Sequence, residues 1–67
     1  MTVDDVRAKV AEIDAIKNDD ERAHSMEDDL YADVLNDIAE GMSGRCAAAL
    51  AAEALKTVRI DFARWCA

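Results

Sequence analysis

His24 is the only histidine of the chain, and acidic residues surround it. Its nearest acidic neighbours are Asp19, Asp20, Glu21, Glu27 and Asp28. A carboxylate can orient an imidazole for general-base catalysis. The chain lacks the other requirements, because it has no cluster of nucleophiles and no glycine-rich phosphate loop, and 67 residues are too few to enclose a deep pocket. We therefore predict no catalytic residue, no cofactor and no enzyme.

Cys46 and Cys66 are the two cysteines, and both fall on one predicted helix. At about 1.5 Å rise per residue they lie about 30 Å apart, whereas a disulfide needs Cα atoms about 4.4–6.8 Å apart. In an up-down-up bundle His24 and Cys66 share one end, where an acid could complete a zinc site. The Cys-x-x-Cys and His-x-x-x-His spacings are absent. We therefore predict neither an internal disulfide nor a metal site.

A row of carboxylates follows one side of a predicted helix, at spacings of four, four and three residues. The row consists of Asp29, Asp33, Asp37 and Glu40. Four helical residues advance about 6 Å, so such a row can imitate DNA phosphates to a protein that grips DNA. The simpler interpretation is a solvated helix face.

The large side chains at helical spacing are candidates for a core or for contacts with a partner. Tyr31, Phe62 and Trp65 are the only aromatic residues, and their place on apolar stripes favours the core. Trp65 lies near the end of the sequence, where large side chains are seldom buried without a neighbour. It is the leading candidate for an interface anchor, and Met26 offers an adaptable contact.

The elements that position these residues are three helices, predicted over residues 3–16, 26–40 and 44–65. Apolar side chains recur at spacings of three and four in each of them. No segment shows the alternation of a β-strand, and the chain contains no proline. We predict one all-α domain over residues 1–67, which is a small three-helix bundle or a helical hairpin that dimerises.

Capping residues indicate where the helices begin and end. Thr2 and Ser25 are each followed three positions on by an aspartate, which is a capping-box pattern. Gly41 is placed to close the second helix. An earlier start of the second helix, near Asp19, stays open, and it decides whether His24 lies in a loop or in a helix.

The charge of the chain is negative and unevenly distributed. Fifteen acids and eight bases give a net charge of −7. Residues 19–40 carry a net −8 and residues 41–67 a net +2. A negative surface repels nucleic acid and anionic membranes, and a helix-turn-helix DNA reader needs a basic recognition surface. We therefore predict no direct contact with nucleic acid and none with membranes, since no apolar run approaches about 20 residues.

Residues 20–31 (DERAHSMEDDLY) and 60–67 (IDFARWCA) resemble small proteins of actinobacteria and of their phages, mycobacteriophages in particular. No activity is assigned to that group, so the resemblance transfers no site residue. It implies a bacterial cytoplasmic setting, which is the host cytoplasm for a phage protein. It also favours a phage protein that acts on a host protein. The low cysteine content and a start unlike a secretory signal favour the same location.

These observations predict a non-enzymatic protein-interaction module that self-associates or binds a host or phage protein. The alternative is an acidic decoy that occupies the DNA-binding surface of a nucleic-acid-handling protein. The partner is a protein or a second copy of the chain. The candidate interaction residues are Trp65, Phe62, Tyr31, Met26, Asp29, Asp33, Asp37 and Glu40.

Overall fold

Helix α1 spans Val3–Ala15 and begins at a capping box. In the computed structural model, which describes residues 1–64, the Thr2 hydroxyl accepts a hydrogen bond from the Asp5 backbone N–H at 3.2 Å. The Asp5 carboxylate accepts one from the Thr2 backbone N–H at 2.8 Å. This backbone hydrogen bond, followed by the one with the Thr2 side chain, lowers the pKa of Asp5. The reciprocal bonds satisfy two backbone donors that the helix itself leaves unpaired.

Helix α2 spans Asp20–Ala39, so the predicted range 26–40 begins too late. Asp19 is its N-cap, and the Asp19 carboxylate accepts a hydrogen bond from the Arg22 backbone N–H at 3.1 Å. Because this cap already satisfies the first turn, the helix starts before the second capping-box pattern and continues through it. His24 therefore lies within α2 and not in a loop.

Helix α3 spans only Gly44–Ala54, whereas the sequence pattern predicts a helix over residues 44–65. A 3-10 helix, η1 (Leu55–Arg59), follows α3, and residues 60–64 are extended. We call residues 60–64 the strap. No glycine or proline follows Ala54, so the end of α3 has a tertiary cause.

That cause is a mismatch between two apolar stripes of the sequence. The inward residues of α3 and η1 include Leu50, Ala54 and Thr57. In a continued α-helix the next position of this stripe is Asp61, four residues after Thr57, and its carboxylate would point into the core. The strap avoids this, because its extended backbone turns Ile60 and Phe62 inward and leaves Asp61 exposed.

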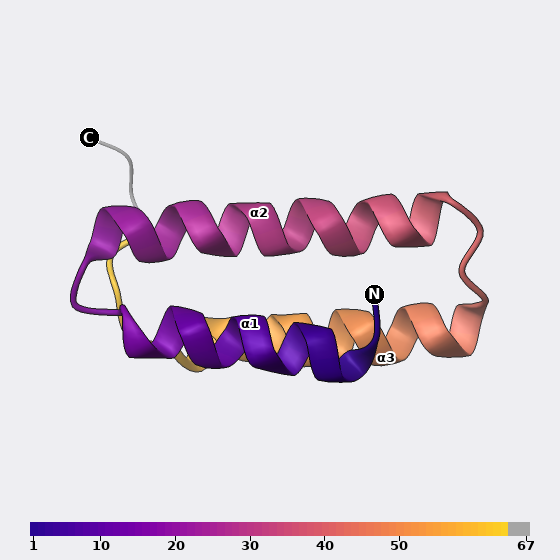
Figure 1. Ribbon diagram of the computed structural model, residues 1–67, viewed down its shortest axis with the longest axis horizontal. Coiled ribbons are helices and arrows are strands. Elements are labelled where there is room, and N and C mark those ends of the chain that lie inside the picture. The colour runs from indigo at the N-terminus through magenta and orange to yellow at the C-terminus, as the bar shows by residue number, and fades with distance from the viewer. Residues whose placement is uncertain (65–67) are drawn as a thin grey trace.

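The three helices form a small up-down-up bundle, which confirms the predicted fold class. Figure 1 shows α2 running antiparallel to both α1 and α3. These two helices lie next to each other along the same side of α2. The strap leaves η1 and passes the N-terminal end of α2. Within residues 1–64, none of the helices combines the length and the apolar character that crossing a bilayer requires.

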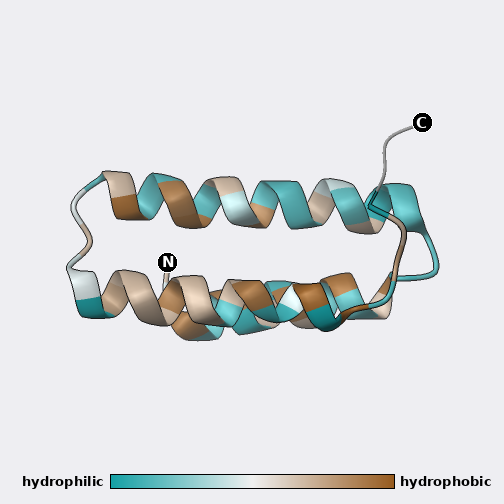
Figure 2. Ribbon diagram, turned by 180° about the vertical axis from the view of Figure 1, so that it is seen from behind, coloured by the Kyte–Doolittle hydropathy of each residue, from teal (hydrophilic) through white to brown (hydrophobic). Residues whose placement is uncertain are grey.

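The core draws on every helix and on the strap. Figure 2 shows brown apolar segments interleaved with teal polar ones along α2, whereas the alanine-rich part of α3 is pale brown. The buried hydrophobic residues are Val6, Ile13, Ala23, Leu30, Val34, Leu50, Ala54, Ile60 and Phe62. The bundle is only 14 Å across its shortest axis, little more than the width of one helix, so it has a single thin layer of core side chains.

Candidate interaction surfaces

The strap is held on α2 by one buried carboxylate. Glu27 is 4% exposed, and its Oε1 and Oε2 accept hydrogen bonds from Arg64 Nε at 3.0 Å and Arg64 Nη2 at 3.1 Å. Arg64 Nη2 also donates to the backbone carbonyls of Thr57 at 2.6 Å and Ile60 at 3.0 Å. The hydrogen bond with Glu27 raises the pKa of the Arg64 guanidinium. Such a forked pair fixes the position of the strap as well as its charge.

One further hydrogen bond joins the strap to α2, and a cation–π contact lies within the strap itself. The backbone N–H of Ala63 donates to the Asp20 carboxylate at 3.1 Å. The Arg64 guanidinium lies 3.8 Å from the centre of the Phe62 ring, a cation–π contact. Phe62, predicted as a helical interaction residue, is thus a core residue of an extended segment, and it is 8% exposed.

Tyr31 and Met26 lie on opposite flanks of the buried stripe of α2, and both are half-buried. The Tyr31 hydroxyl forms a hydrogen bond with the Thr57 hydroxyl, which ties α2 to η1. Met26 packs against the core cluster. These two side chains serve contacts within the chain and offer little surface to a partner.

The acidic row on α2 divides into free and engaged carboxylates. Asp29, Asp33 and Glu40 are exposed and form no ion pair with any of residues 1–64. Asp37 is half-buried and lies 3.0 Å from the amino group of Met1. That contact raises the pKa of the amino group, first through a hydrogen bond and then through charge. The row therefore presents three open carboxylates, on the side of α2 that faces α1.

The side of α2 that faces α3 carries fewer carboxylates, and Asp28 lies on it two helical turns before Leu35. The Tyr31–Thr57 hydrogen bond identifies that side, and Leu35 follows Tyr31 by one helical turn. Leu35 is 64% exposed, and the exposed Ala32 and Ala39 flank it at spacings of three and four. The solvent-facing surface of α2 is therefore acidic towards α1, and towards α3 it is apolar from Ala32 to Ala39.

Helix α3 has an uncharged outer face next to this apolar side. No charged residue occurs between Arg45 and Glu53, and Ala48 and Ala52 are exposed there. Leu55 follows Ala52 by three residues and is 59% exposed. It lies about 200° around the helix from Glu53, which faces α1 through its ion pair with Arg7.

We call this surface the apolar face, and it lies across α2 and α3. It consists of Ala32, Leu35, Ala39, Ala48, Ala52 and Leu55. None of these residues is among the interaction candidates predicted from the sequence. Leu35 falls outside the stripe formed by Leu30, Val34 and Ile38, and a large apolar residue off the stripe was the available clue.

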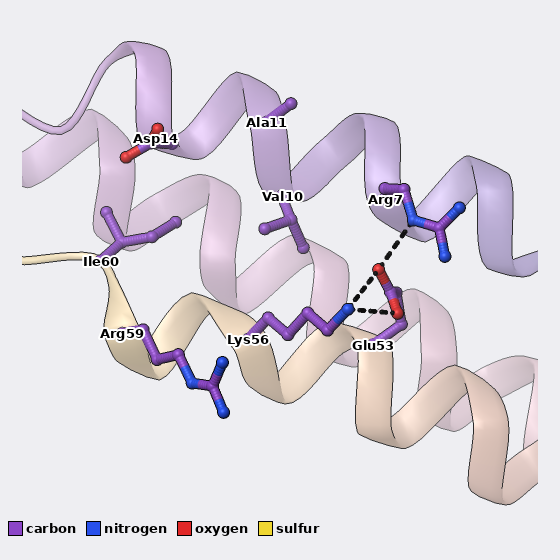
Figure 3. Close-up of a pocket in the computed structure, with 8 residues that line it drawn as sticks. All are labelled: Arg7, Val10, Ala11, Asp14, Glu53, Lys56, Arg59 and Ile60. Atoms are coloured by element: carbon purple, nitrogen blue, oxygen red, sulfur yellow. Dashed lines mark hydrogen bonds and ion pairs between the residues drawn. The ribbon is translucent and has the colours of Figure 1, made fainter.

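A shallow groove of about 460 Å³ lies between α1 and the end of α3. In Figure 3, Arg7 from α1 and Lys56 from η1 converge on Glu53, while the Arg59 side chain turns away from this cluster. Lys56 Nζ and Arg7 Nε each lie 3.0 Å from a Glu53 oxygen. The groove is lined by Arg7, Val10, Ala11, Asp14, Glu53, Lys56, Arg59 and Ile60. The ion cluster joins α1, α3 and η1, and the lining contains no nucleophile paired with a base.

The other predicted candidates are only partly visible. Trp65 and Cys66 lie outside the described residues. His24 Nε2 lies 3.6 Å from the Asp28 carboxylate. Within residues 1–64, no group of three or more His, Cys, Asp or Glu side chains is arranged to hold a metal ion. The zinc hypothesis for His24 and Cys66 is untested, because it depends on Cys66.

Comparison with known proteins identifies no relative. No protein-family model matches the chain, and neither a curated protein nor a solved structure matches it.

Proposed function

We propose that the chain is a non-enzymatic protein-interaction module whose apolar face binds a helix of a partner protein. The observation that carries this proposal is the exposure of Leu35 and Leu55, at 64% and 59%, beside exposed alanines of α2 and α3. Between Arg45 and Glu53, helix α3 is apolar all round, and a helix of this kind is normally buried. Contiguous exposed apolar surface on a small protein typically marks a binding site.

The chemistry of the face specifies the kind of partner. Alanines at the surface of α3 allow another helix to approach closely, and the two leucines supply side chains that can enter its grooves. The open carboxylates Asp29 and Asp33 on the other side of α2 attract a basic protein. We therefore infer an amphipathic partner helix from a protein with a basic surface. The sequence resemblance favours a bacterial cytoplasmic protein as its source.

A second candidate function is the acidic decoy. It is supported by Asp29, Asp33 and Glu40, which are exposed and unpaired within residues 1–64. Carboxylates free of internal partners are available to cationic side chains of a DNA-binding protein. The engagement of Asp37 shortens the row, so we rank the decoy second.

Capture from an actinobacterial lysate tests both functions with two matched variants. Leu35→Asp places a charge on the apolar face, and Asp29→Asn/Asp33→Asn removes charge from the acidic row. We expect the wild-type chain to retain a protein that Leu35→Asp loses by at least tenfold and that the double variant retains. Bound proteins are quantified by mass spectrometry, with and without duplex DNA as competitor.

The outcomes separate the two functions. A protein lost by the double variant and displaced by duplex DNA supports the decoy and contradicts the role of the apolar face. Equal retention by all three chains contradicts both functions. All the substituted residues are exposed, so each variant should unfold within a few degrees of the wild-type chain.

A further inference from the structure

The strap is a separate arm of the molecule, joined to the bundle by an unusual segment. η1 is a 3-10 helix of five residues, Leu55–Arg59. Runs of 3-10 helix longer than three or four residues are uncommon, and we call η1 the hinge. Leu55 and Val58 of this segment are 59% and 64% exposed. The hinge therefore leaves two large apolar side chains in water, beside an arm that is itself well packed.

The arm and its docking site carry opposite charges. Residues 55–64 have a net charge of +2, and residues 20–31 of α2, where the strap docks, have a net charge of −4. The polar contacts between strap and α2 come from two groups of the strap, the Ala63 backbone N–H and the Arg64 guanidinium, which bind Asp20 and Glu27. An arm of this kind fits the equivalent site of a second copy as well as its own.

We propose that two copies of the chain exchange straps, so that Arg64 of each copy binds Glu27 of the other. The exchange conserves the Glu27–Arg64 pair, because each site receives an identical segment. The strap has five residues and spans at most about 17 Å. The two η1 segments must therefore come close together, and this contact covers Leu55 and Val58, which a single copy leaves exposed.

This inference does not rest on the proposed function. Leu55 belongs to both surfaces, but the decisive contact of the exchange, Glu27–Arg64, lies outside the apolar face. A helix that binds at Leu35 and a strap that binds at Glu27 are tested by different substitutions. If helix binding at the apolar face fails its test, strap exchange can still be tested, and the reverse also holds.

Charge reversal provides the experiment. Glu27→Arg leaves two arginines facing each other, and Arg64→Glu leaves two glutamates, so neither variant can form the pair alone. In a mixture, each strap meets a site of opposite charge on the other variant. We expect each variant alone to sediment as a monomer and the equimolar mixture to form a dimer of twice the molar mass.

Matched controls make the result specific. Arg59→Glu, a charge reversal on the exposed hinge residue, keeps both Glu27 and Arg64 and should therefore dimerise alone as the wild-type chain does. Where a single variant unfolds, circular dichroism of the mixture should show the helical signal restored. The doubly substituted chain Glu27→Arg/Arg64→Glu, which restores the pair in one molecule, should fold alone.

Three results would overturn the exchange. The first is a Glu27→Arg and Arg64→Glu mixture that stays monomeric, or stays unfolded while the doubly substituted chain folds. The second is an Arg59→Glu chain that stays monomeric under conditions where the wild-type chain dimerises. The third is a wild-type chain that remains monomeric at millimolar concentration.

Discussion

At Glu53, one buried carboxylate accepts hydrogen bonds from cations on two elements. Lys56 binds it from η1 and Arg7 from α1, at 3.1 Å and 3.0 Å. The hydrogen bond from Lys56, followed by that from Arg7, lowers the pKa of Glu53. The folded chain therefore favours the ionised carboxylate, and its contribution to stability is present at neutral pH and lost as the pH falls through this lowered pKa.

We expect Glu53→Gln to lower the unfolding temperature at neutral pH and to leave it nearly unchanged in acid. The difference from the wild-type chain should narrow once the pH falls below the ordinary value for glutamate, about 4.3. The unfolded chain binds a proton there that the folded chain still resists. Thermal unfolding followed by circular dichroism from about pH 7 to about pH 3 measures the difference in unfolding temperature between the two chains. Asp29→Asn, at an exposed site, is the control, and an unfolding difference independent of pH would contradict the role of Glu53.

At the scale of elements, the turn between α2 and α3 depends on one glycine. Gly41 has φ of 110°, a conformation that side chains of L-residues disfavour. Its backbone N–H donates to the Ile38 carbonyl at 3.1 Å and closes α2. Gly44, by contrast, begins α3 without a positive φ. An added Cβ would have nothing within 4 Å at either glycine, so backbone conformation alone distinguishes them.

Gly41→Ala should destabilise the fold by about 1–2 kcal/mol, the cost of a left-handed L-residue. That corresponds to a fall of roughly 4–8 °C in the unfolding temperature for each kcal/mol in a domain of this size. Gly44→Ala should be neutral or stabilising, because alanine is the better helix former. Urea unfolding of both variants gives the comparison, and equal loss of stability would show that space, not backbone conformation, limits these positions.

At the scale of the whole molecule, a thin core leaves little reserve of stability. Ile13 is fully buried among residues of α2, α3 and the strap. A single core in a chain of this size rarely supplies more than about 3–5 kcal/mol. Replacing a buried isoleucine by alanine costs about 2–5 kcal/mol. The stability lost by one such substitution is therefore comparable with the total that the core supplies.

We expect Ile13→Ala to be largely unfolded at 25 °C, or to lose most of its unfolding free energy. Leu35→Ala is the matched control, because it also removes a large aliphatic side chain but from a site that is 64% exposed. Leu35→Ala should change the unfolding free energy by no more than about 0.5 kcal/mol. Far-ultraviolet circular dichroism and urea titration distinguish the two, and a stable Ile13→Ala chain would mean that stability comes mainly from outside this core.

Local patterns explain most of the helical architecture. The Thr2 capping box, the glycine at 41 and apolar spacings of three and four each act within one or two turns, so sequence alone indicates three helices. The same reasoning misplaced the start of α2, because Ser25 and Asp19 both offer caps and local rules do not rank them. The candidate site was harder to predict. The exposure of Leu35 and Leu55 depends on which sides of α2 and α3 face each other, and local patterns do not decide that.

The sequence by itself determined the all-α class, the concentration of negative charge in the middle of the chain and the alanine-rich outer surface of α3. These follow from composition and from interactions between near neighbours. Only the tertiary structure decided the end of α3, the burial of Phe62 and the pairing of Arg64 with Glu27. The physical reason is that a continued helix would satisfy every local rule yet aim Asp61 at the core. That cost exists only once α1 and α2 are in place to form the core.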